Sequence, residues 1–208
     1  MSEIAVNELP DRLRQLAVKA RDAQARGSHD VVIEYAATIL VDFPGCLAVR
    51  KLHHEAQRAR GFDGPSVAQR AKGVFAGIRS RFGSRKSSES SAPLNQADTV
   101  IAADPWSQEG WRRLAVAAAS ADLRETAVFA WKNLVVLAPR DRVAGLGLVR
   151  ALLEMDRYAE AVTAVEALLK RDPKDGEALA LLRRASIDHT VEKGKWDSDG
   201  SFREKLRD

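Results

Sequence analysis

The apolar residues of this chain recur three or four positions apart, with charged and polar residues between them. In the stretch from residue 111 to 123, for example, the regularly spaced apolar positions are Trp111, Leu114, Ala115 and Ala118. An α-helix has about 3.6 residues per turn, so residues at this spacing lie on one face. The pattern therefore predicts a helix with one apolar stripe. Runs of alternating polarity, which would indicate half-buried strands, are missing from the sequence, and we expect no strands.

A second helix follows the first one closely and ends at a proline, which lacks the N–H that a continuing helix would donate. In the first pair this second helix has Ala127, Trp131 and Leu134 on one face and ends before Pro139. The next pair repeats the scheme with the apolar positions Leu148, Val149, Leu152, Ala161, Val165 and Leu168, followed by Pro173.

The prolines that end these pairs are evenly spaced. Pro105, Pro139 and Pro173 follow one another at intervals of 34 residues. A fixed period of this size indicates a repeated helical hairpin, which cannot bury its apolar stripe alone and must stack on its neighbours. The sequence thus predicts an all-α solenoid.

This pattern resembles the tetratricopeptide repeat family, whose helix–turn–helix unit has aromatic, Leu, Gly, Tyr, Ala, Phe, Ala and Pro residues at set positions. In the unit that ends at Pro139 these positions are Trp111, Leu114, Ala115, Ala118, Ala127, Trp131, Leu134 and Pro139. In the next unit they are Gly145, Leu148, Val149, Leu152, Ala161, Val165, Leu168 and Pro173. Gly145 in the aromatic position and the two missing glycines depart from the family pattern. The resemblance implies an α-solenoid of hairpins, closed by a C-terminal capping helix, that binds proteins and is not an enzyme.

The N-terminal part predicts one more hairpin and then a repeat that an insertion divides. The hairpin has a first helix at 11–26, a turn at Gly27, and a second helix that ends at Pro44 and faces Val32, Ala36 and Ile39 inward. The divided repeat has its first helix at 46–60 and its second at 94–103. We accordingly divide the chain into 1–60, the insertion 61–93, the repeats and capping helix 94–192, and a polar tail 193–208.

The tail is expected to begin where the capping helix, which starts at Glu177, reaches Gly194. Ser201 and Glu204 have the spacing of a capping box, which predicts a last short helix. Trp196 and Phe202 are large aromatic residues in a polar segment, and we expect them to fold back onto a neighbouring helix; the alternative is that they anchor a partner.

The net charge of +4 is concentrated in the insertion. This segment has two acidic residues, Asp63 and Glu89, against the basic residues Arg70, Lys72, Arg79, Arg81, Arg85 and Lys86. Its apolar residues, from Val67 to Phe82, share one helical face. We favour docking of that face on the solenoid. The alternatives are binding to nucleic acid phosphates or to an anionic membrane through the basic face, and contact with a partner protein. The serine-rich run at its end is typical of a linker.

The sequence contains no recognisable catalytic or metal-binding constellation. Cys46 is the single cysteine, which excludes an internal disulfide and fits a reducing compartment. His53 and His54 are adjacent and point about 100° apart on a helix, so they do not share a metal, and we expect the histidines to be exposed. Phosphate-binding loops and serine nucleophile motifs are missing as well. We expect no enzyme activity, no cofactor and no small-molecule substrate, and a cytoplasmic location because no targeting segment is recognisable.

The candidate binding surface is the concave face that the first helices of stacked hairpins line. Its predicted residues are Glu109, Arg112, Val116, Ala119, Val143, Leu146, Arg150, Leu153, Ala180 and Arg184. Val116 and Gly147 stand where carboxylate-clamp members of the family have asparagines, which argues against a co-chaperone. We therefore predict an adaptor that grips a peptide or a helix. The alternatives are a surface-binding protein that uses residues 65–86, and an accessory subunit of an enzyme complex.

Overall fold

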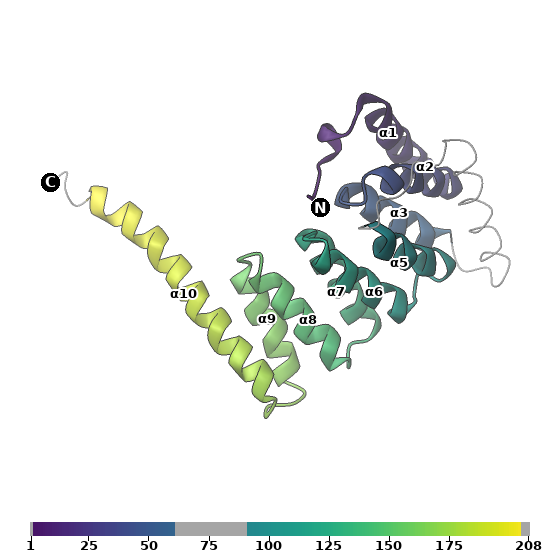
Figure 1. Ribbon diagram of the computed structural model, residues 1–208. Helices are drawn as coiled ribbons and strands as arrows, with labels where there is room; N and C mark the ends of the chain where they lie inside the picture. The colour runs from purple at the N-terminus through teal and green to yellow at the C-terminus, as the bar shows by residue number, and fades with distance from the viewer. Residues whose placement is uncertain (1, 61–90, 205–208) are drawn as a thin grey trace. The chain divides into compact units, whose positions relative to one another are not determined.

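The computed structural model describes residues 2–60 and 91–204, with the side chains described as far as residue 192. Within these ranges the chain consists of helices joined by short turns and contains no strand (Figure 1). The prediction of an all-α chain of helical hairpins is therefore confirmed. The chain divides into two compact units, Met1–Leu137 and Ala138–Asp208.

The first unit begins with a short 3-10 helix, η1 (Val6–Glu8), and the hairpin of α1 (Asp11–Ala25) and α2 (His29–Asp42). The two helices pack against each other along their lengths. Gly27 in the turn between them has a φ of 70°, a left-handed conformation that glycine adopts without strain. The residues predicted to face inward, Val32, Ala36 and Ile39, are fully buried.

The next helices of this unit are α3 (Leu47–Ala59), α5 (Ala92–Ala103), α6 (Gln108–Ser120) and α7 (Arg124–Leu137). Helix α3 packs on α2, and α6 packs on both α5 and α7. The predicted stripe of α6 is its buried face, because Trp111, Leu114, Ala115 and Ala118 are all fully covered. The indole Nε1 of Trp111 also donates a hydrogen bond to the carbonyl oxygen of Pro105 at 3.0 Å, which fixes the start of α6.

The segment before η1 ties the first hairpin to α7. The backbone N–H of Ile4 donates to the carbonyl oxygen of Gly45 at 3.2 Å. The Glu3 carboxylate accepts a hydrogen bond from the backbone N–H of Thr126 at 2.7 Å, in the first turn of α7. A carboxylate at this position favourably meets the positive end of the helix dipole.

The second unit contains α8 (Arg142–Leu153), α9 (Tyr158–Leu169) and α10 (Gly176–Glu204). Helix α9 packs on α8, and α10 packs mainly on α9, as expected of a capping helix. The Leu168 side chain lies where a Cβ atom on Gly145 would project, so a neighbouring leucine fills the space at this departure from the repeat pattern.

The prediction for the C-terminal end is wrong, because α10 continues through Gly194 to Glu204 and no separate short helix starts at Ser201. A single glycine inside a helix costs only about 1 kcal/mol relative to alanine. The strong helix formers Glu192 and Lys193 precede Gly194, and no proline follows it. One unfavourable residue is therefore not enough to end this helix.

The local structure of the turns and caps repeats with the period of the prolines. The N-terminal caps of α6, α8 and α10 are Ser107, Asp141 and Asp175, at intervals of 34 residues, and each accepts backbone hydrogen bonds from the first turn. Asp122 and Asp156, also 34 residues apart, both have a φ of 57° in the hairpin turns. The 34-residue repeat thus determines the backbone conformation as well as the hydrophobic pattern.

Candidate functional site

The outer face of α6 carries the first four residues of the predicted groove. Glu109, Val116 and Ala119 are exposed, and Arg112 is partly buried. Val116 leaves 54% of its surface accessible, so this aliphatic side chain is not used in the packing of α6. The Glu109 carboxylate forms an ion pair with Arg113 one turn later, with 2.7 Å between Oε1 and Nε. This face of α6 thus combines small apolar residues with a charged rim.

In the second unit, the structure separates the predicted groove residues into two groups. Val143 and Arg150 on α8 are exposed, as are Ala180 and Arg184 on α10. Leu146 and Leu153 are buried and contribute to packing, so neither offers a surface to a ligand in this structure. Eight of the twelve residues of α8 are buried, which means that only a narrow strip of this helix faces solvent.

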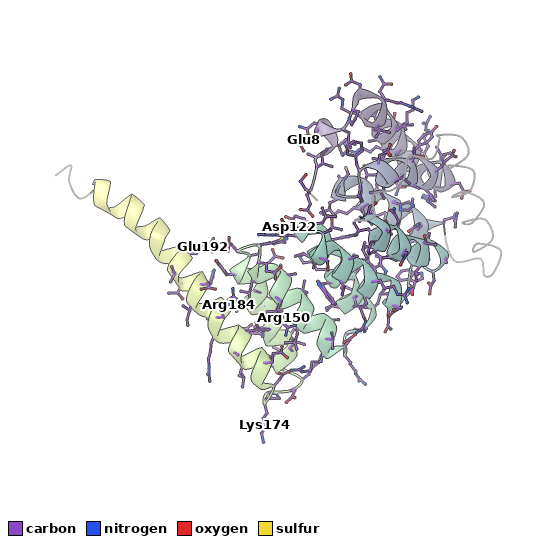
Figure 2. The ribbon with its side chains drawn as sticks, viewed as in Figure 1. Glu8, Asp122, Arg150, Lys174, Arg184 and Glu192 are labelled. Carbon is purple, nitrogen blue, oxygen red and sulfur yellow. The ribbon has the colours of Figure 1, made fainter. Side chains whose placement is uncertain are left out.

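Arg150, which Figure 2 labels, is part of a group of charged residues that joins α8 to the beginning of α10. Its guanidinium pairs with Glu177, whose carboxylate also accepts a hydrogen bond from Arg142 at 2.8 Å. Arg142 binds both oxygens of Asp175 at 2.6 and 2.9 Å. These hydrogen bonds, together with those from the first turn of α10, lower the pKa of Asp175 to about 2. The charge of Arg150 is therefore engaged within the unit, which reduces its value as a ligand contact.

A row of buried polar side chains lies on α3, behind the surface of α6. Arg50, His53, His54 and Gln57 are all almost completely buried, although they are separated by the three- and four-residue steps at which a helix normally presents apolar residues to the core. The expectation that the two adjacent histidines are exposed is therefore wrong.

The Gln57 amide satisfies one nitrogen of each buried histidine. His54 Nδ1 donates to Gln57 Oε1 at 2.9 Å, and Gln57 Nε2 donates to His53 Nε2 at 3.2 Å. This arrangement places the proton of each neutral ring on Nδ1. Burial is the main reason why the pKa of His53 is lowered to about 3 and that of His54 is also lowered, with the nearby arginine charges adding to the effect. Both rings are consequently neutral at physiological pH.

The fourth polar residue of the row, Arg50, joins α3 to α5. Its guanidinium forms an ion pair with Asp98, and its Nη2 atom donates to the carbonyl oxygen of Pro44 at 2.9 Å. Burial raises the pKa of Asp98, whereas the Arg50 charge and hydrogen bond act in the opposite direction. The pair therefore places two opposite charges in the interior, where each depends on the other.

Aromatic contacts connect the same row to α6 and α7. The His54 ring lies 4.7 Å from the Trp111 ring and 6.0 Å from the Phe129 ring, measured between centroids. The Arg58 guanidinium lies over the rings of Trp106 and Trp111, at 5.0 and 5.2 Å, and donates to Asn133 Oδ1 at 2.8 Å. Helix α3 thus supports α6 from behind, and a change in the polar row would displace the candidate binding surface.

The polar row left a signal in the sequence. Residues 50, 53, 54 and 57 have the spacing of a buried stripe, and polar residues at such positions indicate a buried hydrogen-bonded network when the same helix also presents Val49 and Ala56 nearby. Among the described residues no group of three or more histidine, cysteine or acidic side chains is placed to hold a metal ion. The geometry of this row therefore suits packing and orientation of helices.

Two of the predicted features cannot be placed in the fold. The predicted basic surface, Arg70 to Lys86, lies outside the described residues, and so do the side chains of Trp196 and Phe202. No helix in the described part of the chain is both long enough and apolar enough to cross a membrane.

Part of the chain matches a known protein family. A model of the tetratricopeptide repeat family matches residues 124–185, which extend from the start of α7 into α10. No curated protein matches the chain. The matched region contains the caps Asp141 and Asp175 and the left-handed turn residue Asp156, so the family match coincides with the repeated backbone features.

Proposed function

Because residues 124–185 match the tetratricopeptide repeat family, we propose that the chain is an adaptor that binds a peptide or helix of another protein. Repeats of this family generally mediate protein–protein interaction. We assign the contact to the exposed strip of the first helix α6, with Val116 as its apolar anchor. Charged neighbours such as Arg112 would set the orientation of the bound segment.

The observation that carries the proposal is the exposure of an aliphatic side chain on the first helix α6. Val116 leaves 54% of its surface accessible. Helix α6 already buries a full apolar stripe on its inner face, so this valine is not needed for the core. Exposed aliphatic residues beside charged ones are the usual composition of a peptide-binding strip, where the apolar contact supplies affinity and the rim supplies specificity.

Photo-crosslinking of the full chain tests this assignment. A benzoylphenylalanine residue at position 119, on the exposed face of α6, is expected to crosslink a discrete partner from an extract of the source cells. Val116→Asp should abolish that crosslink, because a carboxylate would have to be desolvated in the contact. Val136→Asp is the matched control, since Val136 is an exposed valine, 75% accessible, on the second helix α7.

The outcomes distinguish the adaptor from its alternatives. Equal crosslinking by the Val116→Asp and Val136→Asp proteins would contradict binding at the first helices. Loss of binding as salt is raised from about 50 to about 200 mM, together with loss on deletion of residues 65–86, would favour a phosphate-binding surface. Identification of the crosslinked protein by mass spectrometry would show whether the partner is an enzyme that this chain serves as a subunit.

A further inference from the structure

The outer face of α10 carries a second exposed apolar strip, separate from the one assigned to the partner peptide. Ile187 leaves 62% of its surface accessible and Val191 leaves 51%, although both are large aliphatic residues. Ala180 and Arg184 are exposed on the same side of the helix, because steps of three or four residues return to one face. Ala178 and Ala185, which lie on the opposite side, are fully buried. Helix α10 therefore has a packed inner face and an uncovered aliphatic outer face.

The charges beside this strip are arranged so that the strip complements a second copy of itself. Arg183 and Arg184 lie before Ile187, whereas Asp188 and Glu192 lie after it. When two such helices run antiparallel about a two-fold axis at Ile187, the basic half of each faces the acidic half of the other. Arg184 then lies between Asp188 and Glu192 of the second copy, and the Arg183 stem lies over Val191. A parallel arrangement would instead place like charges opposite each other.

The ion pair that Arg184 forms within one chain does not prevent it from pairing with a second copy. Arg184 and Asp188 approach to 3.7 Å across one turn, with 65% and 36% of their side chains accessible. Exposed pairs of this kind contribute little to stability, so their charges can be shared with a neighbouring molecule at small cost. Figure 2 shows Arg184 and Glu192 along the same helix.

We propose that α10 is a homodimerisation helix, which pairs antiparallel with α10 of a second copy through Ala180, Ile187 and Val191. This strip includes Ala180 and Arg184, which the sequence predicted to lie in the candidate groove, but it shares no residue with the α6 strip assigned to a partner peptide, so either assignment can fail without the other. The interaction is isologous, meaning that each copy contributes the same residues. The side chains of Ile187 and Val191 at its centre would become buried in both copies.

Sedimentation equilibrium of the purified full chain, from low to high micromolar concentration, measures this association directly. We expect a monomer–dimer equilibrium that Ile187→Asp weakens by about tenfold or more, since loss of one buried aliphatic contact per copy and the burial of a carboxylate each oppose pairing. Val136→Asp, on α7, is the matched control and should leave the dissociation constant unchanged. Circular dichroism of each variant checks that the helices are intact.

A charge exchange tests the antiparallel geometry. Arg184→Glu should weaken the dimer, because it faces Asp188 and Glu192 of the other copy, and the variant Arg184→Glu/Glu192→Arg should recover part of the affinity. In the Ile187→Cys protein, mild oxidation should crosslink two copies through their central cysteines, whereas Val136→Cys should not crosslink. A monomer at all concentrations would overturn the proposal, and so would a dimer that neither Ile187→Asp nor Arg184→Glu affects.

Discussion

The buried histidines of α3 make the first unit sensitive to acid. His53 and His54 are neutral in the folded protein, where the pKa of His53 is about 3 and that of His54 is also lowered by burial. In the unfolded chain each ring titrates near its ordinary value of about 6.5. Between these values the unfolded chain binds protons that the folded chain does not. The free energy of unfolding is therefore greatest above about pH 6.5 and falls as the pH is lowered.

The size of this effect follows from the difference between the folded and unfolded pKa values of His53. Lowering the pH from about 7 to about 5 protonates one unfolded histidine almost fully, so that His53 alone costs about 2 kcal/mol, and His54 adds to this loss in the same direction. That is a substantial part of the roughly 5–15 kcal/mol that stabilises an ordinary domain. Asp98 acts in the opposite sense, because burial raises its pKa and the folded state then binds a proton more readily. Arg50 and Arg58 face the same rings and disfavour their protonation further.

Urea unfolding at pH 7, 6 and 5, followed by circular dichroism and tryptophan fluorescence, measures the effect. Fluorescence is informative because Trp111 contacts His54. The triple variant His53→Leu/His54→Phe/Gln57→Leu replaces the row without leaving an amide unpaired, and its free energy of unfolding should be nearly independent of pH in this range. His189→Gln, which changes a partly exposed histidine of α10, should retain the dependence. Equal stability of the parent protein at pH 7 and pH 5, or an undiminished dependence in the triple variant, would refute the reasoning.

Two further substitutions test the packing of the first unit by denaturant unfolding. Arg50→Met should lower the free energy of unfolding by about 3–5 kcal/mol, because the buried Asp98 would lose its cation and would have to be buried as an unpaired charge or take up a proton. Arg50→Met/Asp98→Leu should recover much of that loss, and equal losses in the two proteins would contradict this account. Gly110→Ala should destabilise by about 1–3 kcal/mol, because the new Cβ would lie 2.8 Å from Ile101 Cγ1 and 3.3 Å from the Ile101 backbone nitrogen. Gly176→Ala is its control, since nothing lies within 4 Å of the added Cβ, and similar losses for both alanine variants would show that the contact with Ile101 is not the cause.

The features of the fold that depend on local sequence were predictable. The spacing of the prolines predicted the length of each helical repeat, and the spacing of the apolar residues after Trp111 predicted the buried face of α6. Both follow from helix geometry, which acts over a few residues. The extension of α10 beyond Gly194 was not predicted, because a glycine only shifts the balance between helix and turn by about 1 kcal/mol and the residues around it determine the outcome.

The candidate site was less predictable, because burial depends on what packs against a helix. Leu146 and Arg150 lie on neighbouring positions of the same predicted strip, yet one is buried and the other is exposed. The histidines of α3 are polar, and composition alone indicates exposure for such residues. Only the contacts with Gln57 and Trp111, which are made after the helices assemble, explain why both rings are inside.

The polar row of α3 also determines the register in which α3 packs against α5. An apolar stripe packs nearly as well when it slides by one turn, whereas the Arg50 guanidinium meets the Asp98 carboxylate in only one register of α3 against α5. These two residues are 48 positions apart in the sequence, so chain connectivity constrains their pairing only weakly. Replacement of the pair by well-packed apolar residues would therefore cost little stability but would admit other registers. We therefore expect the unfolding transition of an Arg50→Met/Asp98→Leu protein to be broader than that of the parent protein. Its free energy of unfolding should nevertheless be higher than that of Arg50→Met alone.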